Sequence, residues 1–504
     1  MNELIRLVEN NLSLIRERIE VPDYERKEIK AGIVHIGVGN FHRTHQAYYT
    51  NQVLSKQMDN WGICGVGLMK EDFERYNTFN QQDGLYTLIS KESKGSFQAT
   101  VIGSIIEYLY GPMNPMAVIQ KMSDPGIKII SLTITEGGYN FYSNTGEFIF
   151  SDPLIQWDMT HPDDPKTVFG FLTQALKSRM LSEISGLTIL SCDNIQQNGD
   201  VCKKMLLSYI TEAEPGIVEW VLKNCTFPNC MVDRITPISD ISDIEYLKTH
   251  YQIEDQWPVV AEPFIQWVIE DNFINGRPKW EWAGAQFVND VAPYERMKIR
   301  LLNAGHTLLG LLGTLLGYKT VDETISDPAC KTILRKFMDV EVTPNLGLIE
   351  GIDLEEYKDS LIQRFSNPEI SDQLTRICSE SSTKIPKFVI PTIQDQLKRG
   401  GSIQYGALII ACWYRYIELS ESSSYNIEIQ DIMYKELKQI IISSDKKDPT
   451  VFLEIKPVFG DLQHNDIFVK TYHKLILQLS IDDVRNVIRN LNHEGDIHGQ
   501  KIQM

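Results

Sequence analysis

The stretch Ile33-Val-His-Ile-Gly37-Val-Gly39-Asn40-Phe41-His42-Arg43 decides the fold of this chain. It begins as a β-branched strand, turns at two glycines and continues as a helical pattern. Gly37 permits a tight turn, Gly39 lets a backbone approach a pyrophosphate, and the N-terminus of the following helix favours negative charge. His42 replaces the third glycine of the usual fingerprint, so an ordinary strand–helix turn is the alternative. We expect a dinucleotide to bind here, against Gly37, Gly39, Asn40 and Phe41.

Strand-like and helix-like segments alternate from about residue 30 to residue 288. The strand-like runs are Gly32–Val38, Gly62–Leu68, Lys128–Ile134, Leu187–Ser191, Met231–Ile235 and Gln286–Val288. From about Pro293 onward only helical periodicity is evident, as in Lys298–Leu316 and Ile403–Ile417. This pattern predicts an α/β protein with an N-terminal Rossmann-type domain over residues 1–290, built on a largely parallel sheet. A mainly α-helical C-terminal domain follows over residues 291–504.

Composition narrows the class of protein. The 504 residues carry a net charge of −18, which argues against nucleic acid and anionic membranes as partners because both need a basic surface. The eight cysteines form no CxxC pair and no paired Cys/His spacing, so we predict no metal and expect reduced thiols. The N-terminus lacks the apolar core of a signal peptide, and no apolar stretch approaches the ~18 residues of a membrane span. We expect a cytoplasmic protein with no membrane partner.

Glu71 and Asp72 follow the second strand-like run. A dinucleotide site needs a carboxylate after its second strand to bind the ribose hydroxyls. That carboxylate would also repel a 2′-phosphate, which favours NAD over NADP, although Lys70 and Arg75 act in the opposite sense. The two acids could equally stabilise the start of a helix through its dipole. The prediction is an NAD site with Glu71 and Asp72 beside the ribose.

Three further strand-like runs end in polar residues that could do chemistry. These residues are Glu136, Asn194, and Asp233 with its neighbour Arg234. In open α/β sheets, ligands bind beyond the carboxyl ends of the strands. Each residue alone could be a turn former or a helix cap, but together they indicate a site at this edge of the sheet.

The sequence Lys298-Ile-Arg-Leu-Leu-Asn303-Ala-Gly-His306 opens a nearly continuous apolar run. Burying a lysine, an amide and an imidazole without partners is costly, so a substrate oxygen is a good partner for them. At about 100° per residue, the three fall within roughly 140° of one another on an α-helix. Glycines on the same half indicate close approach of another backbone or of a ligand: Gly305, Gly310 and Gly313. A core helix with a solvated polar end is the alternative.

Taken together, these motifs resemble the polyol-specific long-chain dehydrogenase/reductase family, which includes mannitol 2-dehydrogenase and fructuronate reductase. The matching pieces, in the family's order, are Gly37–His45, Thr133–Tyr139, Ser191–Asn194 with Asn198-Gly199, Met231–Pro237, Lys298–His306 and Lys384–Phe388. The combination is specific, although no single piece is. The resemblance implies a Rossmann-type domain followed by a helical domain, and NAD(P)-dependent interconversion of a polyol and a ketose without metal. Because members are often monomeric, we expect a monomer or a weak oligomer.

The resemblance also implies roles for individual residues. The catalytic residues would be Lys298 as acid/base, Asn194 and Asn303 around the substrate oxygen, His306 orienting substrate, and Glu136 moving protons to or from solvent. The substrate-binding residues would be Asp233, Arg376 and Lys384. The cofactor-binding residues would include Glu71 and Asp72, beside the adenosine ribose.

Lysine and amide groups suit this chemistry. A free lysine has a pKa of about 10.4, and burial or a nearby cation could lower it toward roughly 7–8, where it can accept the proton of a secondary alcohol. Two amide N–H donors can stabilise the resulting alkoxide without titrating themselves. Removing one such donor often costs about 3 kcal/mol.

The C-terminal motif favours one substrate within the family. Lys384-Ile-Pro-Lys-Phe388 resembles the mannitol branch, because the uronate branch would have Gln-Arg after the proline. We therefore expect D-mannitol and D-fructose as the substrate pair. Reduction of fructuronate or tagaturonate, or oxidation of another hexitol or pentitol, is the alternative. A zinc alcohol dehydrogenase would need Cys/His ligand spacings, and a non-catalytic NAD-binding sensor would not need Lys298 together with two asparagines.

Overall fold

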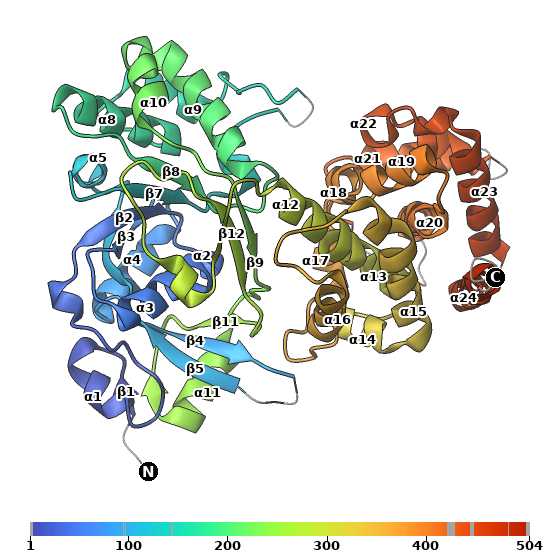
Figure 1. Cartoon of the computed structure of the whole chain (residues 1–504), viewed down its shortest axis with the longest axis horizontal. Helices are drawn as coiled ribbons and strands as arrows, with labels where there is room; N and C mark the ends of the chain where they lie inside the picture. Colours follow the sequence, from blue (N-terminus) through green and yellow to red (C-terminus); the bar gives the residue numbers. More distant parts are fainter. Residues whose placement is uncertain are drawn as a thin grey trace. The chain divides into compact units, whose positions relative to one another are not determined.

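The computed structural model describes residues 4–93, 95, 97–142, 145–420, 429–443, 448–481 and 483–499. The chain forms two compact units, Met1–Ala292 and Pro293–Met504 (Figure 1). The domain ranges expected from the sequence, 1–290 and 291–504, include residues at both ends of the chain that lie outside the described part.

A parallel five-stranded sheet forms the centre of the first unit. Its order is β6-β3-β2-β7-β8, and every neighbouring pair is parallel. The strands are β2 (Ala31–Ile36), β3 (Gly62–Gly67), β6 (Ile105–Tyr110), β7 (Ile129–Leu132) and β8 (Thr188–Ser191). Along the chain this order reads 3-2-1-4-5, a doubly wound order in which ligands bind beyond the carboxyl end of β2, where the order reverses. The predicted Rossmann-type domain is confirmed.

Helices cover one face of this sheet, and a helix together with the smaller sheets covers the other. Ile33 and Ile129 point into one core, whereas Val34 and Ile130, one residue further on, point into the other. The first core contains α3 (Gln46–Lys56), and the second contains α5 (Pro115–Ser123), α8 (Val168–Leu181) and α9 (Asn198–Ala213). A strand that is buried on both faces needs apolar residues at nearly every position, and β-branched residues are common there. This explains the Ile33-Val-His-Ile sequence of β2.

The remaining strands of this unit form two smaller sheets and the short pair β1 (Ile5–Arg6) and β10 (Ile253–Glu254). One sheet has the order β11-β4-β5, with β4 (Tyr86–Lys91), β5 (Phe97–Ile102) and β11 (Val259–Ala261). The other has the order β13-β12-β9, with β9 (Cys230–Asp233), β12 (Gln266–Glu270) and β13 (Gln286–Val288). The sequence pattern placed β9 and β13 in the alternating parallel series. They lie in a separate sheet because β12 pairs between them, antiparallel to β9.

The second unit is helical, and its described residues contain no strand. Its longer helices are α13 (Ala304–Leu315), α15 (Pro328–Lys336), α16 (Leu354–Phe365), α19 (Ile390–Arg399), α20 (Gln404–Leu419), α21 (Tyr434–Ser443), α23 (Asp466–Ile481) and α24 (Val484–Gly499). Shorter helices precede or join them: α12 (Ala292–Lys298), α14 (Val321–Ser326), α17 (Leu374–Cys378), α18 (Ser381–Phe388) and α22 (Lys456–Phe459). Nearly all of α13 is buried, and it packs against α14, α17 and α20. The predicted mainly helical domain is confirmed.

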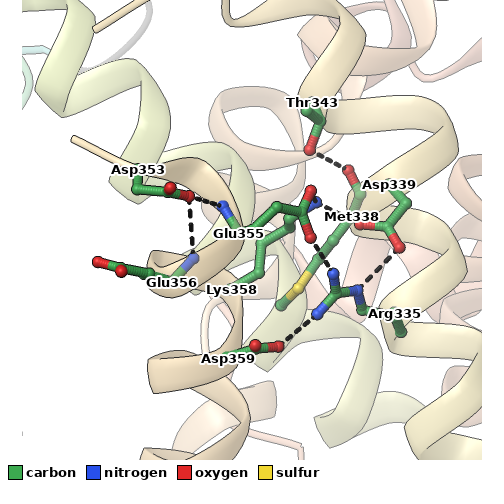
Figure 2. A network of polar contacts seen from close by, with 9 residues as sticks. All are labelled: Arg335, Met338, Asp339, Thr343, Asp353, Glu355, Glu356, Lys358 and Asp359. Carbon is green, nitrogen blue, oxygen red and sulfur yellow. Dashed lines mark hydrogen bonds and ion pairs between the residues drawn. The ribbon is translucent and has the colours of Figure 1, made fainter. Parts of the chain in front are cut away.

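A network of five charged side chains joins the end of α15 to α16 (Figure 2). The Arg335 guanidinium bonds Asp339 at 2.8 Å and Asp359 at 2.6 Å, and it also contacts Glu355. The side chain of Lys358 is only 1% exposed, and its ammonium bonds Glu355 at 2.6 Å and contacts Asp339. Two carboxylates therefore compensate the desolvation of this lysine.

Glu341 is a buried carboxyl at the N-terminus of α20. It accepts the backbone N–H groups of Tyr405 and Gly406, each at 2.8 Å, and the Ser402 hydroxyl at 3.0 Å. Burial raises the pKa of Glu341 to about 7, although these three donors act to lower it. The group therefore gains and loses its proton near neutral pH.

We predict that Lys358→Met lowers the melting temperature, because Asp339 and Glu355 then lose a buried cation. The expected loss is about 1–3 kcal/mol, since the two carboxylates are partly hydrated and relax into water. Lys398→Met is the matched control: Lys398 is 77% exposed and lies 3.4 Å from Asp395, so its removal should change stability by less than about 0.5 kcal/mol. Thermal unfolding followed by circular dichroism measures both, and equal melting temperatures would contradict the prediction.

We predict a pH-dependent stability term from Glu341. Its pKa in the folded state lies above its ordinary value of 4.5, so the folded state binds this proton more tightly than the unfolded chain does. The stabilisation is complete below about pH 4 and is lost as the pH rises through about 7. Glu341→Gln cannot ionise, so the melting temperature of the wild type should fall relative to that of the variant between pH 5 and pH 8. Parallel pH profiles for the two proteins would disprove the assignment.

Candidate active site

The turn after β2 leaves no room for a side chain at Gly37. This residue has a φ of +94°, and a Cβ on it would lie 2.1 Å from the Thr133 carbonyl oxygen beyond the end of β7. The Thr133 hydroxyl donates to the Gly37 carbonyl at 2.6 Å. A Cβ on Gly39 would instead meet only the Gly37 carbonyl, at 4.0 Å, so the space over Gly39 is open. The turn thus fits the close approach of a pyrophosphate.

Asn40 and Phe41 begin α2 (Asn40–Thr44), whereas the sequence predicts one helix over Phe41–Leu54. The backbone leaves the helical region at His45, where φ is −115° and ψ is −93°, and α3 then begins. The Arg43 guanidinium donates to the Asn40 side-chain oxygen at 2.7 Å and to the Trp257 carbonyl at 2.6 Å. Arg43 therefore fixes Asn40 beside the turn, whereas the short helix contributes little dipole.

A pair of buried histidines lies directly beneath this turn. The rings of His35 and His42 stack with their centroids 3.4 Å apart. The His35 nitrogens lie 2.8 Å from the Ser131 hydroxyl and 2.9 Å from the Thr133 hydroxyl. Burial lowers the pKa of His35 to about 3 and holds that of His42 well below its ordinary range, so both rings are neutral at physiological pH. The residue at the third glycine position of the fingerprint, His42, thus packs its ring beneath the turn.

Glu71 and Asp72 follow β3 and differ in their surroundings. Asp72 is buried: one carboxylate oxygen accepts the Met69 N–H at 3.0 Å and the other bonds Arg75 at 2.7 Å. Glu71 is exposed and precedes α4 (Asp72–Gln81). Asp72 thus fixes the turn after β3, and Glu71 presents its carboxylate to solvent at the carboxyl end of the sheet.

Glu136 and Asn194 follow neighbouring strands, β7 and β8, whose last residues Leu132 and Ser191 pair in register. Both side chains are exposed. Between them lies Asp193, a buried carboxylate that accepts the N–H groups of Ile134 and Thr135. Burial raises the pKa of Asp193, and these donors oppose that effect. The sequence analysis assigned the function of this segment to the next residue, Asn194, and therefore missed the contact between Asp193 and the segment after β7.

Asp233 ends β9 and is buried. Its neighbour Arg234 points to main-chain oxygens, donating to Glu262 at 3.0 Å and to Thr44 at 2.5 Å, and its guanidinium lies over the Tyr48 ring. Arg234 therefore fastens the end of β9 to the end of α2. The side chain that the sequence paired with Asp233 thus has a structural role in the first unit.

Lys298 directly precedes a π-helical turn in the second unit, and Asn303 is the last residue of that turn. α12 ends at Lys298, residues Ile299–Asn303 are π-helical, and α13 begins at Ala304, whose N–H bonds the Ile299 carbonyl five residues back. An α-helix would set Lys298 and Asn303 about 140° apart, whereas a π turn, which has more residues per turn, reduces the angle between residues five apart. Lys298, Asn303 and His306 are all buried. Such π turns are frequent at functional sites.

The glycines of α13 serve helix packing. A Cβ on Gly310 would lie 2.6 Å from Ile377 of α17, and one on Gly313 would lie 2.1 Å from the Thr324 hydroxyl of α14. A Cβ on Gly305 would meet Leu334 of α15 at 3.1 Å. Of the two explanations that the sequence left open, the close approach of neighbouring helices accounts for these glycines.

Arg376 and Lys384 come together at the end of α17. The Lys384 ammonium donates to the Ile377 carbonyl at 3.1 Å and to the Arg376 carbonyl at 3.4 Å. Burial, and then the nearby Arg376, lowers the pKa of Lys384. The Arg376 side chain is 62% exposed and pairs with Asp372 at 2.5 Å. The pair forms a cationic end to this helix.

No group of three His, Cys, Asp or Glu side chains among the described residues could hold a metal ion. The eight cysteines, all within the described ranges, are buried and unpaired. No helix in the described ranges is long and apolar enough to cross a membrane.

Comparison with known proteins assigns both units. Residues 31–282 match the family model of the mannitol dehydrogenase Rossmann domain, and residues 290–479 match that of the mannitol dehydrogenase C-terminal domain. The chain is 42% identical over 473 residues to mannitol 2-dehydrogenase of Aspergillus fumigatus, covering 92% of this chain and 94% of that protein. It is 41% identical over 462 residues to mannitol dehydrogenase 2 of Saccharomyces cerevisiae, covering 91% and 92%.

Two solved structures are similar over nearly the whole chain. The Pseudomonas fluorescens mannitol 2-dehydrogenase ternary complex with NAD and D-mannitol has a TM-score of 0.86 and 40% identity, covering 97% of this chain and 99% of that one. A substrate-free D-sorbitol dehydrogenase has a TM-score of 0.88 and 35% identity, covering 96% and 100%. The expectation of a polyol dehydrogenase acting on a CH–OH group is confirmed at this level. The chain belongs to the mannitol dehydrogenase family, as its motifs indicated.

Proposed function

We propose that this polyol dehydrogenase interconverts D-mannitol and D-fructose with NAD. The observation that carries the proposal is the likeness, at 40% identity over 97% of the chain, to an enzyme solved with NAD and D-mannitol. The motif Lys384-Ile-Pro-Lys-Phe388, which resembles the mannitol branch, supports the same substrate.

The first unit offers residues that suit NAD. Gly37 and Gly39 would hold the pyrophosphate, since one admits no Cβ and the other is open above its backbone. Asn40, Phe41 and the exposed Glu71 would lie by the rest of the cofactor, and a carboxylate at Glu71 disfavours a 2′-phosphate. Asp72 would act mainly by shaping the turn that carries Glu71. NAD, when bound, supplies the acceptor for the hydride of the carbinol carbon.

The proton chemistry falls to Lys298. As a neutral amine it would take the hydroxyl proton during oxidation and return it during reduction. The carboxamides of Asn194 and Asn303 would donate to the alkoxide, and such donors act most strongly where water is excluded. His306 and Asp233 would orient the neighbouring hydroxyls, and Glu136, exposed at the end of β7, would pass protons to or from solvent. Arg376 and Lys384 would line the substrate site.

Fructuronate or tagaturonate reduction is the second candidate, because two cations, Arg376 and Lys384, lie together. The neutral polyol suits them better, since Arg376 is paired with Asp372 and Lys384 bonds the carbonyls at the end of α17. A uronate carboxylate would have to displace these partners. Cytoplasmic location and a monomeric or weakly associating state stay predictions.

A substrate panel tests the proposal. D-fructose, fructuronate and tagaturonate are assayed with NADH and NADPH, and D-mannitol, D-sorbitol and D-arabinitol with NAD and NADP. We expect the highest kcat/KM for D-fructose with NADH and for D-mannitol with NAD. A faster uronate reaction would establish the second candidate, and NADH binding without turnover of any sugar would indicate a sensor.

We predict that Lys298→Ala lowers kcat by about 10²–10⁴-fold, because the reaction loses its acid/base. The Kd for NADH, measured by fluorescence titration, should stay within about twofold of the wild type, since this change leaves the dinucleotide turn intact. Lys358→Met provides a control in which another buried lysine of the same unit is removed, and its kcat should stay near that of the wild type. Near-normal turnover by Lys298→Ala would reject Lys298 as the base.

A further inference from the structure

Asp193 ties the segment after β8 to the segment after β7. Its Oδ1 accepts the Thr135 N–H at 2.8 Å, and its Oδ2 accepts the Ile134 N–H at 3.0 Å and the Tyr139 hydroxyl at 2.7 Å. The carboxylate is buried, so these donors replace its lost hydration. Three bonds from one turn make Asp193 a clamp on that turn.

The clamped turn has a strained backbone. Thr135 has a φ of +62°, in the left-handed region that β-branched residues avoid. Such a conformation persists only where surrounding contacts impose it. The two N–H groups that converge on Asp193 belong to Thr135 and the residue before it, so the carboxylate holds the strained residue directly. Glu136 is the next residue, so the direction of its side chain depends on the backbone conformation of Thr135.

The main chain of Asp193 is anchored on the opposite side. Its carbonyl accepts the Ile195 N–H at 2.8 Å and the Asn198 side-chain amide at 3.0 Å. The same amide group of Asn198 bonds both the carbonyl and the N–H of Cys230 at the start of β9, at 2.8 and 2.9 Å. Asn194 therefore directly follows a residue whose side chain and carbonyl are both held by hydrogen bonds.

We propose that Asp193 is a positioning residue that sets the Glu136 carboxylate and the Asn194 carboxamide relative to each other. The inference rests on the proposed function, in which Asn194 stabilises the alkoxide and Glu136 moves protons. Asp193 acts through these two neighbours, because its own oxygens are occupied by Ile134, Thr135 and Tyr139.

The chain contains a matched control for this clamp. Asp158 is also buried, and it accepts two consecutive backbone N–H groups, those of Lys166 and Thr167 at 2.6 and 2.9 Å, and the Thr167 hydroxyl at 2.6 Å. It therefore accepts from the same kinds of donor as Asp193, namely two consecutive backbone N–H groups and one hydroxyl. Asp158 holds the loop before α8, however, and is not adjacent to a proposed site residue. Asp158→Asn and Asp193→Asn each turn an amide N–H toward a backbone donor.

The experiment compares the two variants in the full-length protein. Both should lower the melting temperature, because each loses a buried hydrogen bond. Asp193→Asn should also lower kcat for D-fructose reduction by about 10–100-fold, since small misplacements of catalytic groups have effects of this size. The KM for NADH should stay within about twofold in both variants, and kcat of Asp158→Asn should stay within about twofold of the wild type.

Equal kcat for the two variants, with the wild type active, would overturn the inference and leave the proposed function intact. An inactive wild type would instead overturn the proposed function. If Asp193→Asn does not fold, Tyr139→Phe removes a single donor from the clamp, and Thr167→Val removes the corresponding donor from Asp158. A fall in kcat in Tyr139→Phe alone supports the inference, and unchanged kcat in both contradicts it.

Discussion

The contact between Gly37 and the Thr133 carbonyl is the constraint on which the first unit depends. It sets the turn after β2 against the segment after β7 so closely that no Cβ fits between them. From there, hydrogen bonds continue across the carboxyl ends of β2, β7 and β8, where Thr133 donates to Gly37 and Thr135 donates to Asp193. The Asn198 amide then links the Asp193 carbonyl to that of Cys230, at the start of β9. The predicted cofactor turn, proton-relay residue and amide donor thus share one rigid edge.

In the second unit, the side chains proposed for catalysis lie on a helix and not at the ends of strands. Lys298, Asn303 and His306 lie at the start of an apolar helix whose glycines admit neighbouring helices without space for a Cβ. The π-helical turn Ile299–Asn303 changes the direction of these side chains at a cost in backbone regularity. Close packing around α13 resists relaxation of that turn. Polar groups held in this way suit the proposed stabilisation of an alkoxide, which requires preorganised donors.

The parallel sheet and the helical second unit could be predicted from the sequence because apolar period and glycine placement follow directly from burial. The hairpin β4–β5 and the strand β12 were not predicted, since their pairing depends on partners far along the chain. The break at His45 was missed for a similar reason: the surrounding residues are adequate helix formers, and the stack of His42 on His35 is a tertiary contact.

The sequence by itself determined the types of chemical group and the order in which they come along the chain, because motif composition and strand–helix period are local properties. It also determined the family, through motifs spread over most of the chain. Only the tertiary structure decided which partners the polar side chains bind: Arg234 donates to main-chain oxygens of distant segments, and Asp193 accepts from the strained turn after β7. The reason is physical, since a buried polar group takes whichever partner the fold brings near, and that partner lies elsewhere in the sequence.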